Sequence, residues 1–183
     1  MESNEALSTK QLVDEAQRAY KRGEYLSAGR GYEAAAESYQ VSGEQVMAAE
    51  MLNNSSVAYL QSGDGDAALR VVKDTPAVFV QAGDLRRQGI ALGNLGAALE
   101  AVGSKEAALE AYRQSADLLQ QAGEDSLRAN VLQSISALQM KTGHQLEALA
   151  TMQAGIEGLD HPSPKQRFLK KLLNLPFKIM NGS

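Results

Sequence analysis

Apolar residues recur at spacings of three and four along successive stretches of the chain, and a glycine ends each stretch. The two clearest stretches, 84–102 and 104–122, are rich in Ala, Leu, Gln and Glu, which favour helices. The terminating glycines form two sets with one constant period: Gly23, Gly63, Gly103 and Gly143, and midway between them Gly43, Gly83 and Gly123. The pattern therefore predicts a repeat of helix, turn, helix, turn.

Four such repeats fit into the chain, and each is expected to be a hairpin of two helices. No hairpin can cover its own apolar face, so the repeats must be stabilised by stacking on their neighbours. Pro76 falls inside a predicted helix, where proline removes a hydrogen bond, so we expect a kink or break near residues 74–76. The expected helix pairs are 9–22 with 24–42, 44–62 with 65–82, 84–102 with 104–122, and 124–142 with 144–159.

Four columns of residues keep the same register in every repeat. Two are invariant: Leu12, Leu52, Leu92 and Leu132 in the first helix, and Ala28, Ala68, Ala108 and Ala148 in the second. A third column is always small, as close approach of the two helices of one hairpin requires, and a fourth is large and is expected to fill the gap between hairpins. The small column is Ala16, Ser56, Gly96 and Ser136; the large column is Tyr32, Val72, Tyr112 and Met152.

These columns resemble the tetratricopeptide repeat (TPR) family over about residues 9–160. The long period between equivalent glycines and the Asn-Leu-Gly at 94–96 are similar to the long-repeat class of Pins/LGN-type scaffolds. The resemblance implies an all-α, right-handed α-solenoid of four hairpins in a single domain over 1–183, with repeats at about 9–42, 44–82, 84–122 and 124–160. A second resemblance, to the soluble NSF attachment proteins, rests on the Tyr-x-x-Ala-Ala-x-x-Tyr pattern at 32–39 and ranks lower, because the 40-residue period fits the first class better.

The two ends of the array depart from the pattern. Glu15 stands where other repeats carry Ser55, Leu95 and Ile135, so the first hairpin should be partly solvated there. Ser163 and Pro164 predict the start of a capping helix at about 163–175, followed by a tail at 176–183. This helix is amphipathic and basic, so besides capping repeat 4 it could dock on an anionic membrane or an acidic partner, or support self-association.

Composition narrows the possible functions. The 183 residues include no Cys and no Trp, which excludes disulfides, Cys-based zinc sites and a cysteine nucleophile. Residues 162–183 carry five basic and no acidic residue, whereas 1–161 carry 13 basic and 22 acidic ones, and this acidic body argues against nucleic acid as a partner. Without a signal-like start or an apolar run long enough for a membrane span, we expect a cytoplasmic protein.

No catalytic or metal-binding constellation is evident. His144 and His161, the two histidines, each lie beside a turn residue without a second ligand at metal-binding spacing. The acidic turn at 62–66 lacks the further oxygens of a calcium loop and is expected to cap a helix. We therefore expect no enzyme activity, no cofactor and no metal.

A stacked array of hairpins offers a concave groove lined by the first helix of each pair, and we expect function there. Helical spacing from the leucine column places a polar column in it, Asp14, Asn54, Asn94 and Ser134, with one residue per repeat. The other expected groove residues are Lys10, Gln17, Lys21, Glu50, Asn53, Val57, Ile90, Ala97, Asn130, Gln133 and Lys141.

The resemblance to Pins/LGN-type repeats implies that Asn94, and next Asn54, contact the backbone of a bound peptide. The carboxylate clamp of chaperone-adaptor TPRs is not expected, because Val13, Gln17 and Ile90 replace three of its residues. The leading hypothesis is thus a non-catalytic scaffold that binds a partner peptide in its groove. The alternatives are a homo-oligomeric assembly or membrane-docking module, and an adaptor similar to NSF attachment proteins.

Overall fold

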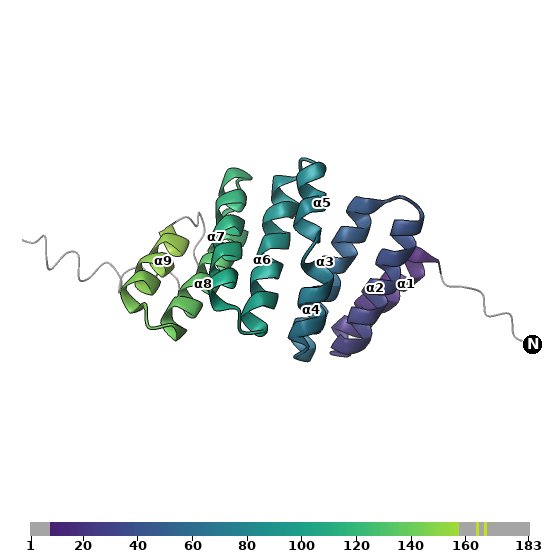
Figure 1. The fold of residues 1–183 in the computed structure, drawn as a ribbon, viewed down its shortest axis with the longest axis horizontal. Helices are drawn as coiled ribbons and strands as arrows, with labels where there is room; N and C mark the ends of the chain where they lie inside the picture. The colour runs from purple at the N-terminus through teal and green to yellow at the C-terminus, as the bar shows by residue number, and fades with distance from the viewer. Residues whose placement is uncertain (1–7, 158–163, 165–166, 168–183) are drawn as a thin grey trace, which may run out of the picture.

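The computed structural model describes residues 8–157, together with Pro164 and Arg167. Throughout this part of the chain the secondary structure is helical, without strands, and the helices stand side by side in an open row from α1 to α9 (Figure 1). The predicted all-α solenoid is confirmed. Residues 8–157 form nine helices: α1 (Thr9–Lys21), α2 (Tyr25–Val41), α3 (Gln45–Ser62), α4 (Gly65–Val72), α5 (Thr75–Gln81), α6 (Leu85–Ala101), α7 (Lys105–Gln121), α8 (Asp125–Lys141) and α9 (Gln145–Glu157).

The predicted glycine turns separate the helices. All seven glycines of the two sets have φ between +67° and +86°, a left-handed conformation that disfavours side chains with a Cβ. At the end of α3, Gly63 donates its N–H to the Leu60 carbonyl, and the Asp64 N–H reaches back to the Tyr59 carbonyl at 2.9 Å. This pairing satisfies carbonyls that the helix end leaves open, so the glycine period sets the element boundaries.

The predicted break at Pro76 is confirmed, and it turns the second helix of repeat 2 into α4 and α5. Lys73 and Asp74 separate the two helices, and Pro76 lies in the first turn of α5, where its missing N–H costs no hydrogen bond. Thr75 is 1% exposed and donates its hydroxyl to the Val72 carbonyl at 2.9 Å. The break is therefore tied to the core through a buried side chain.

Small residues bring neighbouring helices into close contact. The four members of the small column are all buried. A methyl group added at Gly96 would lie 2.6 Å from Cδ1 of Tyr112, so the large residue of hairpin 3 packs directly on its small one. Tyr112 also belongs to a cluster with Leu132 and Ile135 of the next hairpin, as expected for the large column.

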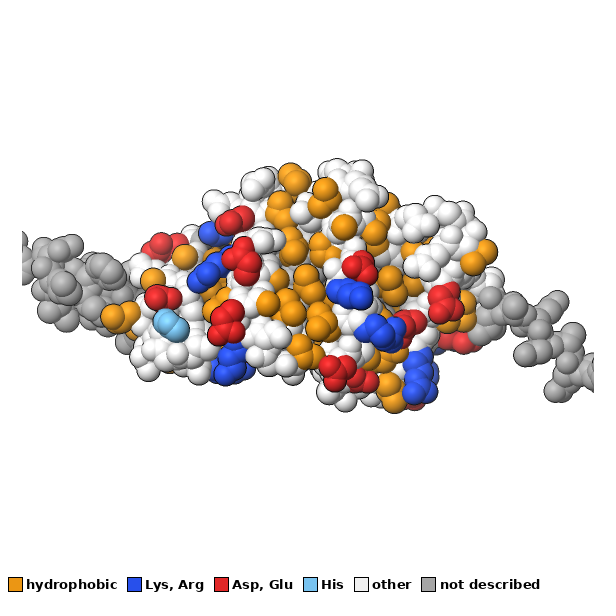
Figure 2. All heavy atoms as spheres, in the orientation of Figure 1, with side chains coloured by type: hydrophobic (Ala, Val, Ile, Leu, Met, Phe, Trp, Pro, Cys, Tyr) orange, Lys and Arg blue, Asp and Glu red, His pale blue; other side chains and the backbone are white. Residues whose placement is uncertain are grey.

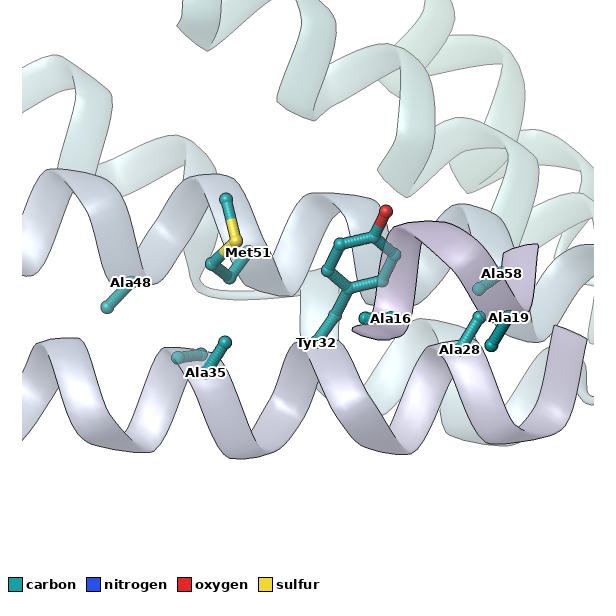
Figure 3. Packing of buried hydrophobic residues seen from close by; sticks show 9 residues of the cluster. Ala16, Ala19, Ala28, Tyr32, Ala35, Ala48, Met51 and Ala58 are labelled. Atoms are coloured by element: carbon teal, nitrogen blue, oxygen red, sulfur yellow. The ribbon is translucent and has the colours of Figure 1, made fainter. Parts of the chain in front are cut away.

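Close approach also occurs between hairpins, which the columns did not predict. A methyl group at Gly29 of α2 would lie 2.8 Å from the Tyr59 ring of α3, although these helices belong to different repeats. In the same region Tyr32 and Met51 lie among alanine side chains from α1, α2 and α3 (Figure 3). Adjacent helices are thus packed tightly both within a hairpin and across the boundary to the next.

The predictions for the two ends of the array concern Glu15 on α1 and a capping helix after α9. Glu15 is exposed on α1, which confirms the expected solvation of the first hairpin. The predicted capping helix at 163–175 and the tail at 176–183 lie outside the described residues, except for Pro164 and Arg167, which are both helical. On the face seen in Figure 2, hydrophobic side chains gather over the middle of the row, and charged ones lie mainly toward its flanks.

Candidate functional site

A groove between α6 and α8, with α7 as its floor, brings together several predicted groove residues. We call it the α6–α8 groove; its volume is about 250 Å³. Predominantly apolar hollows with a few polar groups are typical binding sites for partner side chains. Its lining residues are Ile90, Gly93, Asn94 and Ala97 from α6, Tyr112 and Leu119 from α7, and Leu127, Asn130, Val131 and Ser134 from α8.

Glycines in α6 determine how close the floor of this groove lies to its wall. A methyl group at Gly89 would lie 2.9 Å from Cγ of Leu119, so only glycine fits without a shift of the leucine. The Gly89 carbonyl accepts a hydrogen bond of 2.6 Å from the buried Ser115 hydroxyl of α7. Because α6 and α7 meet this closely, the side chains of α7 fill the base of the groove.

Asn94 supplies a polar group on the α6 wall, and Asn53 holds it in place. Asn53 is 6% exposed, and its Nδ2 donates to the Ala49 carbonyl, which can only accept. The Asn53 Oδ1 is thereby left to accept from the Asn94 Nδ2 at 3.2 Å. Among the described residues no group donates to the Asn94 Oδ1, so this carbonyl oxygen is available to a donor in the groove.

Tyr112 forms part of the floor. Its hydroxyl donates to Glu100 Oε2 at 3.3 Å, and Lys141 pairs with the other oxygen of Glu100 at 2.8 Å. Burial, together with the neighbouring Glu100 charge, raises the pKa of Tyr112 far above its ordinary value. The hydroxyl is therefore a neutral donor at physiological pH and has no role as a base.

Some of the predicted binding residues line the α6–α8 groove, and others lie outside it. Five of them line the α6–α8 groove: Ile90, Asn94, Ala97, Asn130 and Ser134. The polar column is half-buried at all four positions, Asp14, Asn54, Asn94 and Ser134. Outside the groove, the exposed predicted residues are Lys10, Gln17, Lys21, Gln133 and Lys141, and Val57 is half-buried.

Two residues of α3 that were predicted to contact a partner interact with other side chains or backbone groups of the protein itself. Asn53, which was predicted to line the groove, is buried at 6% exposure, and its side chain bonds to Ala49 and Asn94. Glu50 lies 3.4 Å from Arg87 of α6, so a charge pair spans α3 and α6. Both interactions lie between α3 and α6. This pair of first helices is equivalent, one repeat earlier, to the pair α6 and α8 that forms the groove.

Sequence reasoning missed five residues of the groove. On α8, Leu127 lies three residues before Asn130 and Val131 three residues before Ser134, so extending the helical pattern to apolar residues would have found them. Tyr112, Leu119 and Gly93 complete the lining. Tyr112 and Leu119 belong to a second helix, and only the packing of α7 behind α6 shows that they reach the groove.

A second cavity, of about 290 Å³, lies between α2, α3 and the broken α4–α5 pair. At its edge Glu33 accepts from the Tyr59 hydroxyl and pairs with Arg70 at 2.7 Å. The hydrogen bond from Arg70 is the main reason why the pKa of Glu33 is lowered, and burial raises the pKa of Tyr59 to about 12. Since Glu33 and Arg70 are already paired with each other, this cavity is a weaker candidate than the α6–α8 groove.

The described region also bears on metal binding and on membrane insertion. Residues 8–157, with Pro164 and Arg167, contain no group of three or more His, Asp or Glu side chains placed to hold a metal ion. Within the same residues no helix has the length and apolarity needed to cross a membrane.

Comparison with solved structures agrees with the repeat architecture. A Podospora anserina protein described as a kinesin light chain with nearly identical TPR-like repeats superposes with a TM-score of 0.52 at 14% identity, over 95% of this chain and 97% of that one. A single-substitution variant of that protein gives 0.53 at 13% identity, over 95% and 96%. At this identity the likeness shows a TPR-like fold alone.

Comparison at the level of sequence families favours the resemblance that ranked second. No curated protein matches the chain significantly. The family model of the soluble NSF attachment proteins matches residues 2–157, nearly the whole described region. The Pins/LGN class stays unconfirmed, and the chain belongs to the soluble NSF attachment protein family.

Proposed function

We propose that this protein is a non-catalytic adaptor that binds an apolar segment of a partner protein in the α6–α8 groove. The observation that carries the proposal is the combination of an apolar hollow with the Asn94 Oδ1, an acceptor to which no group of the described residues donates. Apolar side chains of the partner would fill the hollow, and a partner N–H would donate to Asn94. Such a hydrogen bond contributes about 0.5–1.5 kcal/mol, so the apolar contacts must provide most of the affinity.

Asn54 and Asp14 extend the same polar column toward α1, and we propose that they contact the partner beyond the groove. Both are half-buried. Lys10 and Gln17 are exposed on α1, and Gln133 is exposed on α8. In this proposal these residues would contact a partner segment longer than the groove itself.

The test uses partners captured by the full-length protein and identified by mass spectrometry, followed by affinity measurements with the purified partner. Ala97→Glu puts a charge into the apolar hollow and should weaken binding at least tenfold, because that charge would have to be desolvated. Ala107→Glu, at an exposed position on α7, is the matched control and should bind normally. Helicity measured by circular dichroism should be the same for both.

Substitution of the amides is the finer test. Asn54→Ala and Asn94→Ala should each weaken binding severalfold. If Ala97→Glu and the double amide variant bind every captured partner like the unmodified protein, the groove is not the binding site.

Membership in the family carries a second proposal, that the partner is an ATPase of the NSF type. The family is named for attachment to NSF, and its model covers residues 2–157. Purified NSF-type ATPase should then bind the immobilised protein. Binding that Ala97→Glu leaves unchanged would place the ATPase on a surface other than the groove.

A further inference from the structure

We infer that the α6–α8 groove binds one aromatic side chain of the partner that carries a hydrogen-bond donor, the indole of a tryptophan or the phenol of a tyrosine. We call this side chain the anchor. The inference rests on the proposed function, because it names the residue that enters the same groove. Three properties of the described lining support it: its size, its lack of charge and the acceptor on its α6 wall.

The hollow between α6 and α8 is large enough for an aromatic ring. Its volume is about 250 Å³, whereas an apolar cavity of roughly 150 Å³ holds benzene. A phenol is slightly larger than benzene, and an indole is a fused pair of rings, so either can enter. Ile90 and Val131, both half-buried, lie on opposite walls and would flank the ring.

Gly93 keeps this space open. A methyl group at Gly93 would lie 3.2 Å from the Ser115 hydroxyl oxygen on α7 and 3.6 Å from Cγ2 of Val131 on α8. It would therefore occupy the space between the floor and the α8 wall, where the anchor is proposed to lie. At the equivalent position of the preceding repeat, Asn53 is 6% exposed and bonds across to α6. A bulky anchor therefore depends on glycine at position 93.

The described lining of the groove carries no charged side chain. A Lys, Arg, Asp or Glu anchor would lose its hydration there without meeting a counter-charge, which is unfavourable. The cavity between α2 and the α4–α5 pair differs in this respect, because Glu33, Arg70 and Asp74 line it. The chemistry of the α6–α8 groove therefore favours a neutral and largely apolar anchor.

The acceptor on the α6 wall distinguishes between apolar anchors. The amide nitrogen of Asn94 donates to Asn53 at 3.2 Å, and no group of the described residues donates to the Asn94 Oδ1. A leucine or phenylalanine anchor that covered this oxygen would separate it from water and offer no hydrogen bond in return. The indole N–H of tryptophan and the hydroxyl of tyrosine each place one donor on an otherwise apolar ring. Such a side chain matches both the hollow and its acceptor.

The chain contains no tryptophan, so the fluorescence of a tryptophan peptide can be followed without a background from the protein. The probe is acetyl-Ala-Ala-Trp-Ala-Ala-amide, to which full-length protein is added. Binding should shift the emission to shorter wavelength, because the indole leaves water. A competing peptide with Tyr at its centre should displace the probe, and peptides with Phe or Leu there should bind roughly fivefold more weakly than the Tyr peptide. An unchanged emission spectrum, or equal competition by the three peptides, would overturn the inference.

The hydrogen bond is tested with a second peptide, in which the tryptophan is methylated on its indole nitrogen and has no donor. The unmodified protein should bind this peptide roughly fivefold more weakly than the tryptophan peptide. Asn94→Leu should bind the two equally, because leucine accepts no hydrogen bond, and circular dichroism checks that its helices are retained. Equal binding of both peptides by the unmodified protein, or a difference that persists in Asn94→Leu, contradicts the assignment of a donor.

The size of the hollow is tested by two matched substitutions that add the same volume. Ala97→Val, in the lining, should weaken binding of the tryptophan peptide roughly tenfold, whereas Ala137→Val, at the equivalent and exposed position of α8, should have less than about a twofold effect. Equal effects would rule out the placement of the anchor in this groove. The proposed function has its own readout: if Ala97→Glu weakens binding of captured partners although the peptides do not differ, the groove stands and the anchor assignment fails.

Discussion

The two halves of the row share their packing rules but differ in what lies between successive first helices. In both halves a buried serine donates to a glycine carbonyl of the preceding helix, Ser55 to Gly29 at 2.9 Å and Ser115 to Gly89 at 2.6 Å. The first pair crosses a hairpin boundary and the second lies within a hairpin. Tight packing thus recurs from each helix to the next and is not confined to the two helices of one repeat.

A single position distinguishes the space between α3 and α6 from the groove between α6 and α8. Asn53 of α3 and Gly93 of α6 occupy equivalent positions in successive repeats. Asn53 fills the space between α3 and α6 and bonds to Asn94, whereas Gly93 leaves a hollow between α6 and α8. The residues that repeat with the 40-residue period therefore form the helical scaffold, whereas a position that differs between repeats, such as Asn53 and Gly93, determines where the groove is open.

The largest expected effect concerns the short α5 of the N-terminal half. Phe79 is 1% exposed and packs with Ala49 and Ala91, so it is the main anchor of a seven-residue helix. Phe79→Ala should lower the free energy of unfolding by about 3–5 kcal/mol in urea titrations. Val80→Ala, one residue on and 57% exposed, should change it by less than about 0.5 kcal/mol. A small effect of Phe79→Ala would mean that α5 is held by its backbone rather than by this ring.

The next largest loss of stability is expected when the polar side chain between α3 and α6, Asn53, is removed. Asn53→Ala removes a side chain that bonds to Ala49 and Asn94, and should cost about 1–3 kcal/mol. Asn54→Ala, on the neighbouring half-buried position, is the control and should cost clearly less. If both substitutions cost the same, Asn53 is not a structural residue, and the contrast with Gly93 loses its basis.

A matched pair of serines tests whether the two halves really share a packing rule. Ser55→Ala and Ser115→Ala each remove one buried hydrogen bond and should destabilise by similar amounts, about 0.5–1.5 kcal/mol each. Ser104→Ala, before α7 and without a capping bond from its side chain, should be close to neutral. A large inequality between Ser55 and Ser115 would show that the hairpin boundary matters after all.

The smallest effect is expected at low pH and in the N-terminal half. The pKa of Glu33 is lowered from 4.5 in the folded protein, chiefly by the hydrogen bond from Arg70. The ionised carboxylate therefore adds stability above its unfolded pKa, and this contribution is lost as the pH falls through the folded value. Between pH 6 and pH 3 the unmodified protein should lose more stability than Glu33→Gln in urea titrations. Parallel pH profiles would show that the pair with Arg70 contributes nothing.

Much of the fold follows from local sequence features. Glycines at fixed spacing determine the turns, because other residues rarely adopt the positive φ found at all seven. Pro76 determines the break between α4 and α5, and the leucine and alanine columns determine which face of each helix is buried. Five groove residues were predictable for the same reason, since helical spacing alone places them on one face.

The sequence by itself thus determined the helices, their boundaries and the repeat, because these depend on backbone conformation and on periodic burial within the length of one helix. Only the tertiary structure decided that Asn53 points inward while its neighbour Asn54 stays half-exposed. Adjacent helical residues differ by about 100° around the axis, so a modest rotation of α3 against α6 selects which amide meets the core. The same relative placement of helices decided which groove is open and that α7 provides its floor.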